Sequence, residues 1–96
     1  MRVLELRKKS ENGKALKAFA DIELENGIVV RELRIIQDQG KRPWVACPQI
    51  SWKDPQDNQV KYKTIITFPS QLKGEIDLLI LNAWVREKEN PSAERG

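Results

Sequence analysis

Apolar and polar residues alternate along much of the first two thirds of this sequence, with the period of strands that bury one face. The clearest alternation runs from residue 16 to residue 24, where every second residue is apolar: Leu16, Ala18, Ala20, Ile22 and Leu24. Phe19 is an exception, because it lies among the polar residues of the opposite face. Shorter apolar segments at residues 3–6, 28–36, 43–47 and 60–68 predict further strands. The pattern therefore predicts a sheet of about five strands.

Turn-forming residues separate these segments. Asn26-Gly27 lies between two apolar segments and predicts an antiparallel hairpin, because both residues tolerate positive φ. Pro48 cannot donate a backbone hydrogen bond, so we expect it to end a strand. Residues 49–59 carry Pro, Asp, Asn and Gln without periodicity and predict a loop. An antiparallel sheet with one irregular connection before its last strand follows from this order.

The period changes after Pro69, a residue that suits the first turn of a helix. Residues 70–89 predict a helix with an apolar stripe that packs on the sheet: Leu72, Ile76, Leu79, Ile80 and Ala83. The fold class is therefore α+β, with one domain at residues 1–90. Pro91 is a stop signal, and residues 91–96 are expected to form a flexible tail.

The helix also carries a second apolar strip, and a monomer of this size could hardly cover both strips. The second strip contains Leu78, Leu81 and Val85, and Trp84 lies between the two strips. We infer that Leu78, Leu81, Trp84 and Val85 form a dimer interface. The alternatives are that a strand or the C-terminal tail covers this strip, or that edge strands pair instead.

Composition excludes several classes of function. The 96 residues contain one cysteine and no histidine, so we expect no disulfide within the chain, no metal site and no cofactor. Cys47 lacks a histidine base and is expected to be a small buried hydrophobe. No P-loop, GxGxxG or nucleophile elbow is present, so we expect neither an enzyme nor a small-molecule substrate. No apolar run suits a signal peptide or a membrane span, which predicts a cytoplasmic protein.

The net charge is +3, and the positive charge is concentrated in the middle of the chain. Residues 41–73 carry six Lys or Arg against two Asp or Glu. Cations can contact the phosphates of a nucleic acid, and tryptophans beside them can stack on its bases. The candidate contacts to nucleic acid are Arg42, Lys53, Lys61, Lys63 and Lys73, with Trp52 as a candidate for base stacking. The alternative is an ordinary solvated basic face with tryptophans that are partly buried anchors.

Three segments, in this order, resemble the SpoVG family of small bacterial proteins (stage V sporulation protein G, also called septation protein). They are residues 29–36, "VVRELRII", residues 45–48, "VACP", and residues 73–84, "KGEIDLLILNAW". Arg34 stands at the arginine of the family's strand motif, and the resemblance covers roughly residues 1–86. It implies an α+β homodimer that binds DNA with a sequence preference and regulates septation, sporulation or virulence-related expression. RNA binding is also reported in the family, and Lys73 carries over as a residue that contacts nucleic acid.

Two other interpretations remain open at this point. The chain could be a dimeric protein-interaction module of cell division that does not bind nucleic acid. It could also bind RNA in preference to DNA, with Trp52 stacking on an unpaired base.

Overall fold

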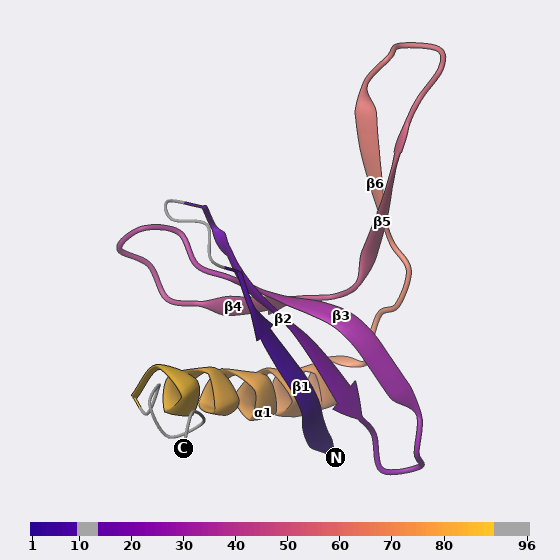
Figure 1. The fold of residues 1–96 in the computed structure, drawn as a ribbon. Helices are drawn as coiled ribbons and strands as arrows, with labels where there is room; N and C mark the ends of the chain where they lie inside the picture. The colour runs from indigo at the N-terminus through magenta and orange to yellow at the C-terminus, as the bar shows by residue number, and fades with distance from the viewer. Residues whose placement is uncertain (10–13, 90–96) are drawn as a thin grey trace.

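The structure is a computed structural model, and it describes residues 1–9 and 14–89 of the chain. Four antiparallel strands form one sheet in the order β1-β2-β3-β4: β1 (Arg2–Lys8), β2 (Leu16–Glu23), β3 (Val29–Ile36) and β4 (Trp44–Ala46). Two further strands, β5 (Gln49–Lys53) and β6 (Val60–Thr64), form a separate antiparallel pair, and α1 (Ser70–Glu89) follows (Figure 1). The predicted α+β class and the helix bounds are confirmed.

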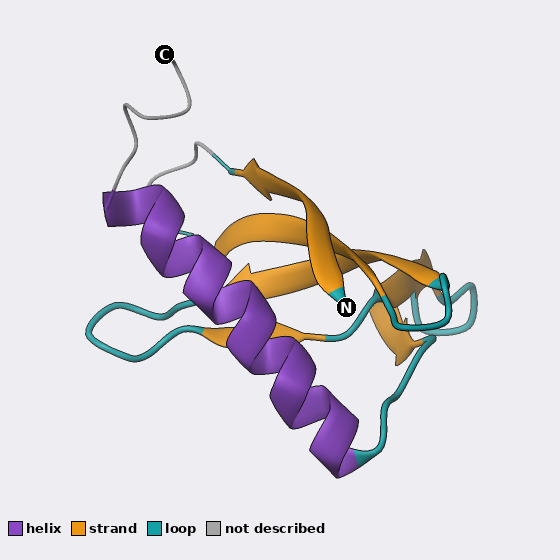
Figure 2. Cartoon of the chain, turned by 90° about the horizontal axis from the view of Figure 1, so that it is seen from below, coloured by secondary structure: helices purple, strands orange, loops and turns teal. Residues whose placement is uncertain are grey.

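The core lies between the four-stranded sheet and α1, which crosses one face of the sheet (Figure 2). The alternating residues Ala18, Ala20 and Ile22 of β2 are fully buried on this face. Ile76 and Ile80 are buried on the helix, one turn apart. Burying an isoleucine side chain contributes about 1.5 to 3 kcal/mol to the free energy of folding, so these few side chains supply much of the hydrophobic stabilisation of this small domain. Within the described residues, no helix is long and apolar enough to cross a membrane.

Trp84 does not lie where the sequence pattern suggested. Its side chain is only 7% exposed and packs into the core of its own chain, one turn beyond Ile80. Leu81 also packs partly against the core, whereas Leu78 (65% exposed) and Val85 remain on the outer side of the helix. Because a tryptophan buries more area than any other side chain, the buried stripe shifts toward it. Little of Trp84 is therefore left for a partner subunit.

The predicted hairpin between β2 and β3 is present, with a longer connection than a two-residue turn. The N–H of Gly27 donates to the C=O of Leu24 (3.0 Å), and the N–H of Leu24 donates to the C=O of Ile28 (2.8 Å). Gly27 has φ of 86°, whereas Asn26 is not among the residues with positive φ. A turn followed by a left-handed glycine is the usual three-residue hairpin connection, so only one of the two residues uses its tolerance of positive φ.

The predicted loop at residues 49–59 is wrong in its first half, because Gln49–Lys53 is strand β5. Every residue of β5 is exposed, so no buried face imposes a hydrophobic pattern on it. The following strand is shorter than predicted and ends at Thr64, while Ile66 and Phe68 pack against the core. The single sheet of about five strands is thus a four-stranded sheet and a separate hairpin.

We call residues 49–64 the arm. Its two strands project away from the body formed by the sheet and α1 (Figure 1). The molecule is correspondingly elongated, with principal extents of 51 × 36 × 24 Å. The predicted tail, residues 91–96, lies outside the described residues.

Candidate nucleic-acid interface

The arm carries most of the residues that the sequence suggested for nucleic-acid binding. Trp52 and Lys53 lie on β5, and Lys61 and Lys63 lie on β6. Trp52 pairs with Lys61 and Ile50 pairs with Lys63, and directly opposed residues share a face. One face of the arm therefore presents Ile50, Trp52, Lys61 and Lys63, and the other presents Ser51, Lys53, Val60 and Tyr62. Sequence reasoning grouped the lysines as candidates but missed their arrangement on the two faces of a hairpin, because it assigned Trp52 and Lys53 to a loop.

Lys61 is engaged by the turn at the tip of the arm. Its Nζ lies 2.8 Å from Oδ2 of Asp54 and 3.2 Å from Oδ2 of Asp57. Hydrogen bonds to Asp54 and then Asp57 raise the pKa of Lys61, and the bond from Lys61 lowers the pKa of Asp54. The same aspartates accept the N–H of Gln56 (2.9 Å) and of Gln59 (3.1 Å), which closes the turn. The charge of Lys61 is therefore largely neutralised.

Lys53 and Lys63 are the available cations of the arm. Both are exposed, and neither forms an ion pair with any residue in the described ranges 1–9 and 14–89. Trp52, 44% exposed, adds an aromatic plane on the same face as Lys63. An exposed aromatic beside a free lysine can stack on a base while the lysine contacts a phosphate.

Arg42 lies apart from the arm. It is exposed in the loop between β3 and β4 and has no ion pair within the described part of the chain. Both views place this loop on the side of the body away from the arm (Figures 1 and 2). The five basic candidates that the sequence suggested are thus divided among separate surfaces.

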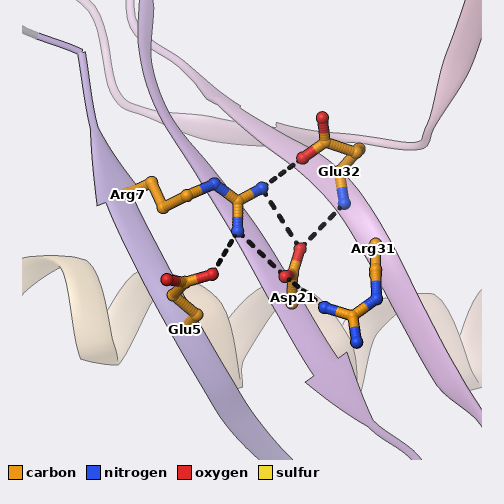
Figure 3. Close-up of polar contacts among 5 residues, drawn as sticks. All are labelled: Glu5, Arg7, Asp21, Arg31 and Glu32. Carbon is orange, nitrogen blue, oxygen red and sulfur yellow. Dashed lines mark hydrogen bonds and ion pairs between the residues drawn. The ribbon is translucent and has the colours of Figure 1, made fainter.

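The outer face of the sheet holds a charged cluster that sequence reasoning missed (Figure 3). Asp21, 2% exposed, accepts hydrogen bonds from Nη1 of Arg7 (2.9 Å) and Nη1 of Arg31 (2.9 Å). Arg7 also bonds Glu5 (2.6 Å) and Glu32. Burial alone would raise the pKa of Asp21, but the bond from Arg7 and that from the backbone of Glu32 hold this pKa below its ordinary value. The only signal in the sequence was that Asp21 occupies a polar position of an alternating strand.

A β-bulge accompanies this cluster. Ala20 pairs with Leu33 and Ile22 pairs with Val30, so both Arg31 and Glu32 lie opposite Asp21. Glu32 has φ of 65°, a conformation that non-glycine residues seldom adopt. The N–H of Glu32 donates to Oδ1 of Asp21 at 3.1 Å, which satisfies a donor that the strand ladder leaves unpaired at the bulge.

In a comparison with known families, the SpoVG family model matches residues 1–86. The chain belongs to the SpoVG family. This membership relates it to proteins of sporulation and septation. Neither the curated proteins nor the solved structures include a significant match.

In this SpoVG-family chain, the three segments that carry the family resemblance contact one another. Nη2 of Arg34 on β3 donates to the C=O of Cys47, after β4, at 3.2 Å. Lys73, on the first turn of α1, is half-buried, and its Nζ donates to the C=O of Val45 (2.9 Å) and bonds Asp77 (2.7 Å). Lys73 thus joins the helix to the edge of the sheet. These contacts give Lys73 a packing role, and its charge is partly neutralised by Asp77.

The described residues offer little for metal or thiol chemistry. Across residues 1–9 and 14–89, no group of three Cys, Asp or Glu side chains is arranged to hold a metal ion. Cys47 is a half-buried free thiol.

Proposed function

We propose that this SpoVG-family protein is a homodimeric nucleic-acid-binding regulator of septation-type or sporulation-type gene expression, and that it catalyses no reaction. The observation that carries the proposal is the arm, a projecting two-stranded ribbon with Lys53, Lys63 and Trp52 exposed along it. A two-stranded β-ribbon fits the major groove of B-DNA, which is about 12 Å wide. Lysines on both faces of such a ribbon reach phosphates on either side of the groove.

Dimerisation is supported by the outer strip of α1. Gly74, Leu78, Leu81 and Val85 follow one another at the i, i+4, i+7, i+11 spacing of a single helix face. Leu78 and Val85 are exposed, and a Cβ built at Gly74 would meet nothing within 4 Å. Two such strips can pack against each other with close backbone approach, and the two-fold axis would present two arms to one duplex. Because the two arms of a dimer are linked, their weak contacts with one duplex combine into a higher overall affinity.

One observation favours a second candidate function. Besides its lysines, the arm exposes large apolar side chains, among them Ile50, Val60 and Tyr62. Exposed apolar residues gathered on one element mark contact surfaces for proteins. A dimeric interaction module of cell division, without nucleic-acid binding, is the alternative that these residues support.

The test is selection from random DNA and RNA pools at about 150 mM salt, using the wild-type protein and two double variants. Lys53→Glu/Lys63→Glu reverses the charge of the free arm lysines. Lys14→Glu/Arg86→Glu makes the same change of charge away from the arm, at exposed positions that form no ion pair within the described residues. We expect the wild-type protein and the control variant Lys14→Glu/Arg86→Glu to enrich a sequence motif, and the arm variant Lys53→Glu/Lys63→Glu to enrich none. No enrichment from either pool by a folded dimer would overturn the proposal and favour the interaction module.

A further inference from the structure

A groove of about 440 Å³ lies between the outer face of the sheet and the base of the arm. The sheet contributes Phe19 and Arg34, and the arm contributes Gln49, Ser51 and Tyr62. None of the three arm lysines is among the lining residues of the groove, so its chemistry differs from theirs. Nothing in the family relationship assigns a role to it.

Two aromatic rings line this groove from different elements. Phe19 lies on the polar face of β2, which points away from α1, so the packing of the core does not explain an aromatic residue at this position. Arg7 and Lys9 lie beside it, each with its charged group 5.9 Å from the ring centroid. Tyr62, 66% exposed, faces the groove from β6. Aromatic rings with cations beside them bind flat heterocycles, because every nucleobase has a π-face that can stack.

Hydrogen-bonding groups surround the rings. Arg34 makes one hydrogen bond within the described residues, to the C=O of Cys47, and its Nε is buried without an acceptor there. The side chains of Gln49 and Ser51 make no hydrogen bond in that same part of the chain. A guanidinium, an amide and a hydroxyl together can donate to and accept from the edge of a base. The ring nitrogens and carbonyl oxygens of a base can accept hydrogen bonds from the Arg34 guanidinium where this residue lines the groove.

The lining indicates which part of a nucleotide enters. The carboxylate of Glu32 also lines the groove, but it is paired with Arg7 and does not act as a free charge. Leu16 and Ile50 line the groove beside the two rings, and these apolar contacts favour a flat, uncharged base over a phosphate. Two exposed cations without an ion pair in the described residues flank the groove, Lys9 on the sheet and Lys63 on the arm, and a backbone passing outside can contact them.

We propose that this groove binds an unpaired base of a single-stranded nucleic acid, stacked on Phe19 and Tyr62 and contacted at its edge by Arg34, Gln49 or Ser51. The inference rests on the proposed nucleic-acid function and extends it, because a base can enter such a groove only after it leaves a duplex stack. The arm lysines bind any backbone, and the groove adds preference for single strands. RNA and single-stranded DNA share this chemistry.

The experiment measures affinity by fluorescence anisotropy for three probes: a labelled 12-nucleotide RNA, the DNA of the same sequence, and the corresponding DNA duplex. Tyr62→Ala removes an exposed ring and leaves the core intact, and Trp44→Ala removes an exposed ring outside the groove as its control. Phe19→Leu removes the other ring, and Phe68→Leu makes the same change against the core. Losing one stacked base weakens binding about fivefold to a hundredfold.

The expected result is that Tyr62→Ala and Phe19→Leu weaken binding of the two single strands within that range and change duplex binding less than twofold. Their controls should leave all three affinities unchanged. Whichever single strand loses more identifies the preferred source of the base. Unchanged single-strand affinity in both groove variants overturns the inference. So does a loss of dimer in Tyr62→Ala by sedimentation, which would make a second copy the occupant.

The arm variant Lys53→Glu/Lys63→Glu separates this inference from the proposed function. If it weakens all three probes while the groove variants weaken none, only the groove inference fails. If it weakens none of the three, the proposed function itself fails.

Discussion

The carboxylate of Asp21 holds the backbone of Glu32 at the bulge of β3, with 3.1 Å between Oδ1 of Asp21 and the backbone nitrogen of Glu32. A non-glycine residue in the left-handed region costs about 1 to 3 kcal/mol and persists only where its surroundings fix it. Here the buried carboxylate and its two arginines supply that constraint. Asp21 therefore connects β1, β2 and β3 on the face of the sheet that α1 does not cover.

Asp21→Asn should lower the free energy of unfolding by about 2 kcal/mol, because the charge that pairs with Arg7 and Arg31 is lost. The loss stays at the low end for a buried pair, since both arginines are partly exposed to water. Urea denaturation measures the change. Asp38→Asn is the control, at an exposed aspartate whose side chain has no hydrogen bond within the described residues, and should change stability by less than about 0.5 kcal/mol. Equal effects would argue against the role assigned to Asp21.

Acidification should weaken the fold through the same group. The pKa of Asp21 in the folded chain lies below its ordinary value of 3.8, so the unfolded chain takes up the proton first as the pH falls. The stabilisation is complete above the ordinary pKa and is lost as the pH falls through the folded value. Unfolding by urea between pH 2.5 and 6 should therefore show a steeper loss below about pH 4 for wild type than for Asp21→Asn. Parallel curves for the two proteins would contradict this.

The conformation of Glu32 predicts an order of stability among its variants. Glycine accepts positive φ without strain but costs about 0.5 to 1 kcal/mol through the freedom of the unfolded chain, so Glu32→Gly should lie within about 0.5 kcal/mol of wild type. A β-branched residue avoids this conformation, so Glu32→Val should cost about 1 to 2 kcal/mol. Glu23→Val tests the same change at a strand position that is not among the residues with positive φ. Thermal unfolding should rank Glu32→Val as the least stable.

Sequence pattern predicted the elements that bury a face. The alternation in β2, the turn at Gly27 and the helical spacing after Pro69 each reflect a local constraint that the residues themselves reveal. The helix bounds and the α+β class followed from these signals. Trp84 was misplaced because the position of a buried stripe depends on side-chain area as well as on spacing.

The candidate site was less accessible to prediction, since its geometry comes from pairing between exposed strands. β5 buries no side chain, so its sequence does not alternate between apolar and polar residues. Only the register of β5 with β6 brings Trp52 beside Lys61. The pairing of Lys61 with Asp54 and Asp57, and of Lys73 with Asp77, likewise depends on turn and helix geometry. Five basic candidates therefore divide into three exposed cations and two that already have acidic partners.

The free and the paired lysines of the arm predict opposite changes in the salt dependence of nucleic-acid binding. Each cation that contacts a phosphate of duplex DNA contributes about 0.9 to the slope of log affinity against log salt concentration. Lys63→Gln should lower that slope by about one unit. Asp54→Asn/Asp57→Asn should raise it by about one unit and tighten binding, because Lys61 becomes available while the asparagine oxygens still accept the turn hydrogen bonds. Titrations from 50 to 200 mM salt measure both, and a lower slope in the asparagine variant would remove the arm tip from the interface.

Trp84 and Leu78 lie on the same helix, and their variants should affect different properties. Trp84→Ala leaves a cavity in the core and should lower the free energy of unfolding by about 3 to 5 kcal/mol. Leu78→Glu places a charge at an exposed position, so the helix should still form, but the outer strips of two copies could no longer pack together. Sedimentation equilibrium should therefore show at least tenfold weaker dimerisation for Leu78→Glu. Arg86→Glu is the control, at an exposed position of the same helix that points away from the outer strip and forms no ion pair within the described residues. A dimer that withstands Leu78→Glu must use another surface, and the exposed apolar residues of the arm would be the next to test.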